Sequence, residues 1–101
     1  MKNQRLRNLT TGRLHTTMDD IYKDVEFLTG ETGVMTHQLP NAFRAMQPWL
    51  REKVTEERFW DGEFDTTHEG ETAIEPMSDE DRRAFWGRYA QLPSPFASLM
   101  S

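Results

Sequence analysis

The chain has 101 residues and contains no cysteine. This absence excludes disulfide bonds, cysteine-ligated zinc sites, iron–sulfur clusters and thiol nucleophiles. The default expectation for such a chain is a cytoplasmic location.

Long apolar runs are also missing. No stretch approaches the ~20 apolar residues that span a membrane, and the basic N-terminal residues are not followed by the apolar segment of a secretion signal. We therefore expect a protein that is neither embedded in a membrane nor exported by a conventional signal. Serine is scarce and confined to the last quarter of the chain, without a Gly-x-Ser-x-Gly turn, which argues against nucleophilic hydrolysis.

Apolar residues make up only 36% of the chain, although 11% of it is aromatic. Aromatic side chains bury large areas, so a small core remains feasible. A chain of this length buries roughly two-thirds of the surface that its unfolded form exposes. These values predict one small folded domain with polar ends.

Charge is distributed unevenly around the net value of −5. Before residue 16 there are four basic residues and no acidic one: Lys2, Arg5, Arg7 and Arg13. Between residues 61 and 81 there are nine acidic residues and no lysine or arginine: Asp61, Glu63, Asp65, Glu69, Glu71, Glu75, Asp79, Glu80 and Asp81. The chain is thus basic at its start and acidic in its second half.

Three segments carry helical signals. Apolar residues recur at helical spacing after Thr17, which predicts a helix over residues 17–29 with Gly30 at its end. Thr36 can cap a second helix over residues 36–46, and Pro48 predicts a bend or a new helix from there to about Trp60. Ser78 can cap a third helix over residues 78–92, whose apolar stripe consists of Phe85, Trp86, Tyr89, Ala90 and Leu92.

The predicted fold is therefore mainly α, a small single-domain bundle of three to four helices. Residues 1–16 are expected to form an irregular basic N-terminal arm, and residues 17–92 the helical domain. Within that domain residues 61–77 form an acidic loop, and residues 93–101 are a C-terminal tail. The faces of the three predicted helices are expected to pack together.

Few residue patterns indicate chemistry. His15, His37 and His68 lie in three different segments without metal-ligand spacing, so no metal site and no cofactor are expected. The run from Asp61 has acids at alternating positions like a calcium loop, but Thr66 and Thr72 occupy the diagnostic glycine and glutamate positions. No catalytic residue is therefore predicted.

Several short motifs in the first half resemble a known kind of domain. They are T-T-G-R-L-H at 10–15, I-Y at 21–22, F-L-T-G at 27–30 and T-H-Q-L-P at 36–40. This order resembles a small domain of bacteriophage-encoded hypothetical proteins of undefined function, over residues 9–50. The resemblance implies a phage or prophage origin and expression in the cytoplasm of a bacterial host, and it carries over no catalytic residues.

The function predicted from the sequence is that of a non-enzymatic phage accessory protein. It would bind a host protein through its acidic surface, with a nucleic-acid-handling defence complex as a candidate partner. The residues predicted to contact this partner are Trp60, Asp61, Glu63, Phe64, Asp65, Glu69 and Glu71. One alternative is a nucleic-acid-binding protein that uses the basic arm, and another is a small enzyme that uses His15 or His37 with a carboxylate.

Overall fold

The computed structural model of the protein describes residues 1–62 and 65–93. This part of the chain contains four α-helices and two short 3₁₀ helices: α1 (Asn3–Thr11), α2 (Met18–Thr29), η1 (Thr36–Gln38), α3 (Leu39–Lys53), η2 (Glu57–Phe59) and α4 (Asp79–Gln91). Its only β pairing is an isolated antiparallel bridge between Lys2 and Glu71. The expected mainly α fold is confirmed. No helix in the described ranges combines the length and apolar character needed to cross a membrane.

Helix α2 follows its sequence signals closely. The Thr17 side chain accepts a hydrogen bond from the amide of Asp20, as expected of an N-cap. Gly30 ends the helix in the left-handed conformation at φ 74°, and its amide donates to the carbonyl of Glu26. The inward face buries Ile21, Val25 and Leu28.

Helix α3 is longer than its sequence indicated. It continues through Pro48 to Lys53, whereas residues 36–38 form the separate turn η1. Proline has no amide hydrogen and disturbs the carbonyls of the preceding turn. Arg88 of α4 donates through Nε to the carbonyl of Ala45 in that turn, at 2.7 Å. The amide that Pro48 lacks would have bonded the carbonyl of Arg44, so the contact from Arg88 adds a long-range bond to this turn without replacing the lost one. The bend or new helix expected from there to about Trp60 is the last part of α3 and, after a break, η2.

The expectation of an irregular N-terminal arm is wrong, because residues 3–11 form α1. Leu6 and Leu9 are fully buried in the core. Arg7 and Asn8, which lie on other sides of the helix than Leu6, also have no exposed surface. A helix that buries polar and apolar residues around most of its circumference has no clear apolar periodicity, which explains why the pattern concealed it.

One apolar core joins all four helices. Its fully buried members come from α1, α2, α3 and η2, and include Leu6, Leu9, Leu28, Met46, Leu50 and Phe59. Helix α4 packs mainly on α3 and contributes one buried residue, Phe85. Trp86, which the sequence placed in the apolar stripe, is 40% exposed.

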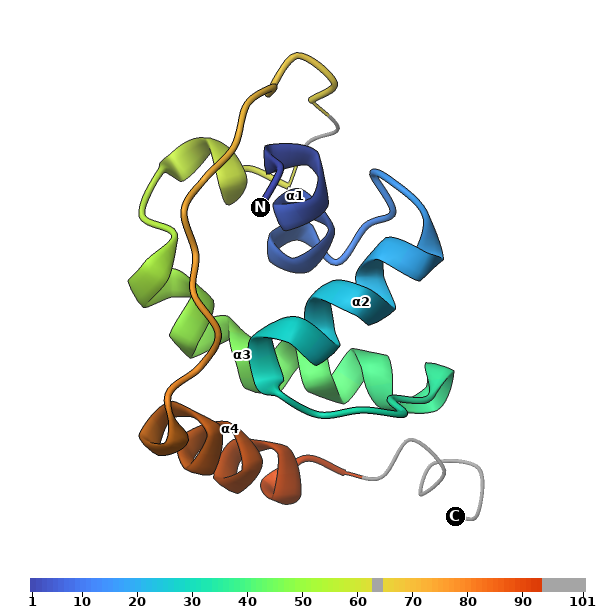
Figure 1. Cartoon of the computed structure of the whole chain (residues 1–101), viewed down its shortest axis with the longest axis vertical. Helices are drawn as coiled ribbons and strands as arrows, with labels where there is room; N and C mark the ends of the chain where they lie inside the picture. The colour runs from blue at the N-terminus through green and yellow to red at the C-terminus, as the bar shows by residue number, and fades with distance from the viewer. Residues whose placement is uncertain (63–64, 94–101) are drawn as a thin grey trace.

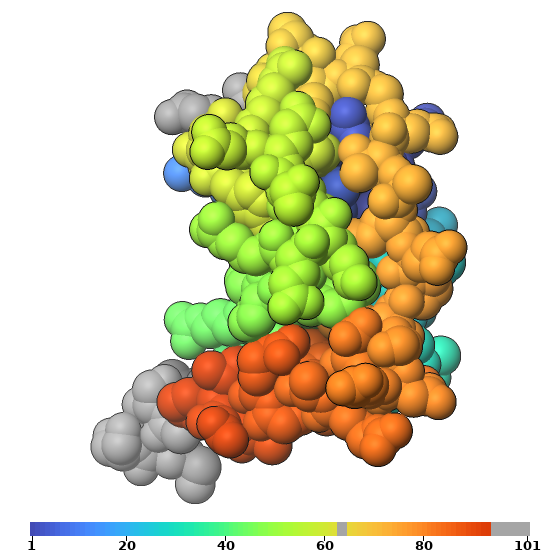
Figure 2. Space-filling model, turned by 90° about the vertical axis from the view of Figure 1, so that its left-hand side faces the viewer, coloured from blue at the N-terminus to red at the C-terminus, as the bar shows by residue number. Residues whose placement is uncertain are grey.

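A long segment without helix connects the two ends of the molecule. Residues 69–77, which we call the strap, run along the left-hand side of Figure 1 from the region of α1 down to α4. Figure 2 faces this side and shows the strap beside the column formed by the end of α3 and η2. The strap is the second half of the predicted acidic loop.

Two glycines give a matched test of this packing. Gly30 has a positive φ, and an added Cβ would lie 3.0 Å from Cζ of Arg82. Gly87 lies within α4, and an added Cβ there would meet nothing within 4 Å. We expect Gly30→Ala to lower the free energy of unfolding by about 1–2 kcal/mol. Gly87→Ala should raise it by about 0.5–1 kcal/mol.

Urea unfolding of both variants measures these changes. Equal effects of the two substitutions would show that neither the left-handed conformation nor the contact with Arg82 constrains Gly30.

Candidate functional site

The strap is the candidate functional site, and its first half is fixed against the N-terminal residues. Thr72 and Met1 exchange two hydrogen bonds through their backbone nitrogens and carbonyls, at 2.9 and 3.0 Å. The amide of Asn3 donates to the carbonyl of Gly70 at 2.9 Å. These bonds align the segment antiparallel to the first residues of the chain.

The second half of the strap alternates like a β-strand and is fixed at its lower end. Ala73 and Glu75 are exposed, whereas Ile74 is half-buried. The amide of Met77 donates to the carbonyl of Leu28 at the end of α2, at 2.8 Å. Alternation with a period of two is typical of an extended strand lying on a protein surface. The strap is therefore an ordered part of the fold.

The carboxylates of this region face solvent. Five of them are exposed and form no ion pair with any residue in the described ranges: Glu69, Glu71 and Glu75 on the strap, and Asp79 and Glu80 in the first turn of α4. We call the first three the strap carboxylates. Their charges remain available to attract a cationic partner.

The first acids of the run are engaged inside the fold instead. Asp61 pairs with Arg7 at 3.3 Å. Asp65 accepts a hydrogen bond from Nε of Arg58 at 2.7 Å and two more from the amide and hydroxyl of Thr67. The hydrogen bond from Arg58, followed by that from Thr67, holds the pKa of the Asp65 carboxyl well below its usual range.

The residues predicted for partner binding therefore divide into groups. Glu69 and Glu71 lie on the strap with exposed side chains. Trp60 is half-buried and donates through Nε1 to the carbonyl of Val54. The centroid of its ring lies 4.1 Å from Cζ of Arg51. Two further predicted residues, Glu63 and Phe64, lie outside the described residues.

Arg7 organises the region where the strap begins. Its side chain has no exposed surface and donates to the carbonyl of Arg58 at 2.6 Å and to Nδ1 of His68 at 3.1 Å. A guanidinium can only donate, so Nδ1 must accept and the imidazole hydrogen lies on Nε2. That nitrogen is 3.5 Å from the Glu56 carboxylate. His68, an isolated histidine in the sequence, is thus a buried structural residue.

The other histidines do not converge with it. His15 is hydrogen-bonded through Nε2 to the Thr11 hydroxyl at 3.0 Å, and burial, with the charges of Arg7 and Arg13, lowers its pKa. His37 lies exposed in η1. Across residues 1–62 and 65–93, no three histidine or acidic side chains are placed to hold a metal ion.

The basic residues predicted to contact nucleic acid are partly engaged as well. Arg5 makes a two-pronged contact with Asp24, at 3.0 and 2.7 Å, and lies 3.8 Å from Asp20. Arg7 is buried, as described above. The nucleic-acid hypothesis therefore loses two of the four cations on which it rests.

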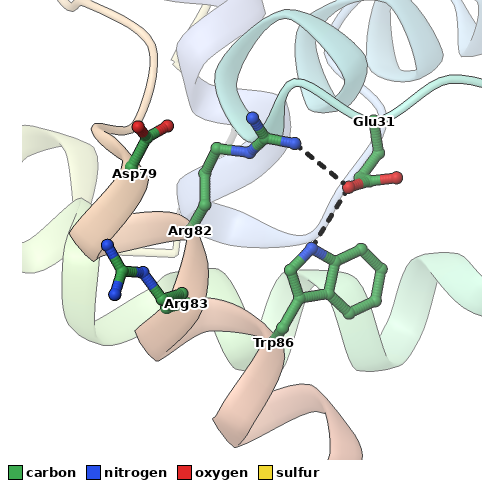
Figure 3. Close-up of a pocket in the computed structure, with 5 residues that line it drawn as sticks. All are labelled: Glu31, Asp79, Arg82, Arg83 and Trp86. Carbon is green, nitrogen blue, oxygen red and sulfur yellow. Dashed lines mark hydrogen bonds and ion pairs between the residues drawn. The ribbon is translucent and has the colours of Figure 1, made fainter.

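A hollow of about 400 Å³ beside α4 was not anticipated from the sequence. Figure 3 shows Arg82 and Trp86 of α4 both reaching Glu31 in the connector after α2. Their nitrogens lie 3.3 and 3.2 Å from the same carboxylate oxygen. Asp79 and Arg83 complete the lining, so its two acids balance its two arginines. We assign Glu31 a structural role, in which it holds α4 against the connector that follows α2.

Residues 1–60 match the model of a protein family described as a domain of unknown function, DUF7736. The chain belongs to this family. Membership confirms the coarser part of the resemblance seen in the sequence, a family of undefined function. Comparisons with curated proteins and with solved structures gave no match.

The DUF7736 segment contains α1, α2, α3 and both 3₁₀ helices. The residues that follow this segment, which include the strap and α4, complete its interior. His68 and Asp61 supply partners for Arg7, and Phe85 enters the common core. The candidate site thus lies outside the matched residues but is built on them.

The Arg7 cluster can be tested through stability. Arg7→Met retains much of the volume but leaves the Arg58 carbonyl and His68 without their donor. We expect a loss of about 3 kcal/mol or more in the free energy of unfolding, because buried acceptors remain unsatisfied. Arg44→Met, at an exposed position of α3, is the control and should change stability little. Similar unfolding midpoints in urea for the two variants would contradict this role of Arg7.

The pair of Asp65 and Arg58 predicts a dependence on pH. A carboxyl whose pKa is lowered by folding stabilises the protein above its ordinary pKa of 3.8, and this contribution is lost as the pH falls below that value. Asp65→Asn should therefore be less stable than the wild type at pH ~7, and the difference should shrink on acidification. Thermal unfolding across this range measures the effect.

Glu69→Gln, which removes an exposed carboxylate, serves as the control and should follow the wild type throughout. A constant gap between Asp65→Asn and the wild type at every pH would exclude the ion pair as its cause.

Proposed function

We propose that the protein is a non-enzymatic binding protein whose strap carboxylates engage a basic surface of a partner protein. The observation that carries this proposal is the anchoring of the strap at both ends. Thr72 is held by Met1, and Met77 by Leu28. Glu75 lies between these two anchors, and Glu69 and Glu71 flank Gly70, whose carbonyl accepts from the amide of Asn3. The strap carboxylates are therefore presented in a fixed arrangement, which lowers the entropy lost on binding.

The proposed contact with the partner lies later in the acidic run than the sequence predicted, on the strap carboxylates instead of Asp61 and Asp65. Asp61 and Asp65 already have cationic partners within the fold, so binding through them would first require those pairs to separate. The strap carboxylates need no such rearrangement. Unpaired charges of one sign also accelerate encounter with an oppositely charged surface, and the net charge of −5 acts in the same direction.

A host protein that handles nucleic acid is the partner class that this charge fits best. Grooves that hold a phosphate backbone are lined by lysine and arginine, and a dense acidic surface can occupy them. The resemblance of residues 9–50 to bacteriophage proteins supports a phage accessory role, exerted in the bacterial cytoplasm against a defence nuclease complex.

Single charge reversals at matched positions test the proposal. Glu75→Lys changes the middle of the strap, while Asp19→Lys makes the same charge change at the start of α2, on the other side of the molecule in Figure 1. Each protein is used to capture partners from a lysate of the bacterial host, followed by mass spectrometry. We expect the wild type and Asp19→Lys to retain the same nucleic-acid-handling protein, and Glu75→Lys to lose it.

Adding Glu71→Lys to Glu75→Lys should deepen the loss without shifting the thermal unfolding midpoint, since both side chains are exposed. Full capture by this double variant would sink the proposal. Binding of a labelled DNA duplex that weakens steeply with salt would favour the nucleic-acid alternative instead.

A further inference from the structure

The strap is a single extended segment, and only part of its backbone is paired. Thr72 directs its amide and carbonyl toward Met1, and the bridge of Lys2 with Glu71 extends this pairing by one residue. In an extended segment, the polar backbone groups of neighbouring residues point to opposite edges. Those of Ala73 and Glu75 therefore lie on the edge that faces away from Met1.

This second edge is free. Among the described residues, neither the amides nor the carbonyls of Ala73 and Glu75 form a hydrogen bond. A strand edge with unpaired backbone groups is a template for another strand. Two features of the strap restrict which strand can pair with it. Glu71 and Glu75 place negative charge on its outer face, and Pro76, which has no amide hydrogen, limits the length of the edge that can pair.

The surface of the protein is hollowed beside this edge. A hollow of about 310 Å³ lies between the strap and Lys53 at the end of α3, and Ser78 and Asp81 line its lower part. Four consecutive residues of the strap, 73–76, line the same hollow, and Ala73 and Glu75 are among them. Figure 2 shows the strap and the end of α3 side by side on this face.

We propose that the free edge of the strap receives an extended basic segment of the partner protein by strand addition. This inference rests on the proposed function and specifies how the partner is recognised. Backbone hydrogen bonds to Ala73 and Glu75 give affinity, and side chains on alternate positions give specificity.

The register of the strap defines the sequence that fits. A partner residue opposite Ile74 places its side chain on the inner face, against a half-buried apolar residue, and should be apolar. Partner residues opposite Ala73 and Glu75 place theirs on the outer face, among the strap carboxylates, and should be lysine or arginine. Lys53 is the one cation in the hollow and is opposed there by Glu75 and Asp81. The preferred occupant therefore alternates basic and apolar residues.

A synthetic probe separates strand addition from simple charge attraction. The probe is a fluorescent peptide of alternating lysine and valine, and the control has the same sequence with alternate amides N-methylated to remove hydrogen bonding along one edge. We expect the full-length protein to bind the control at least about tenfold more weakly. Glu75→Gln should also weaken binding of the probe, whereas Asp19→Asn should not.

Amide hydrogen exchange provides the second measurement. Binding of the probe should slow exchange at Ala73 and Glu75, whose amides become hydrogen-bonded. Equal affinity for the two peptides with unchanged exchange would overturn strand addition, while leaving recognition of a basic surface by the strap carboxylates intact. Absence of binding to the probe would also overturn strand addition. The proposed function would not be affected by that result, because the lysate capture experiment tests it separately.

Discussion

A guanidinium that has lost contact with solvent must find its acceptors inside the protein, and Arg7 finds them on segments far from α1 in the sequence. The carbonyl of Arg58, the imidazole of His68 and the carboxylate of Asp61 all converge on it. A buried charge is costly unless its hydrogen bonds are satisfied, so this cluster favours one arrangement of α1 against residues 58–68. The strap begins directly after His68, and its pairing with Met1 follows from the same arrangement.

The acidic residues from 61 to 81 consequently fall into two groups with different roles. The first carboxylates neutralise cations of the fold, since Asp61 lies with Arg7 and Asp65 with Arg58. The later carboxylates stand on a segment that is held at both ends, and they form no ion pair with any residue in the described ranges. Like charges repel, and this division limits the repulsion that nine acids would otherwise produce within a short stretch.

Sequence patterns predicted those parts of the fold that depend on neighbouring residues. Helices α2 and α4 carry their own caps, Thr17 and Ser78, and both begin where these residues predict. The sequence also located the acidic region that contains the strap. It could not reveal α1, which buries Arg7, nor the passage of α3 through Pro48, which is accompanied by a contact from Arg88. The partners of Arg7 and the contact from Arg88 come from residues more than 40 positions away. The partner of Asp61 is equally distant, whereas Asp65 pairs with the nearby Arg58.

The boundary of the family match does not coincide with the boundary of the packed interior. The match ends at residue 60, but the hydrogen-bond partners of Arg7 and the covering of α3 by α4 lie beyond it. The part of the chain that the family model matches is thus smaller than the part that forms the common interior. Residues 1–60 depend on the residues that follow them for an acceptor of Arg7 and for the cover of α3.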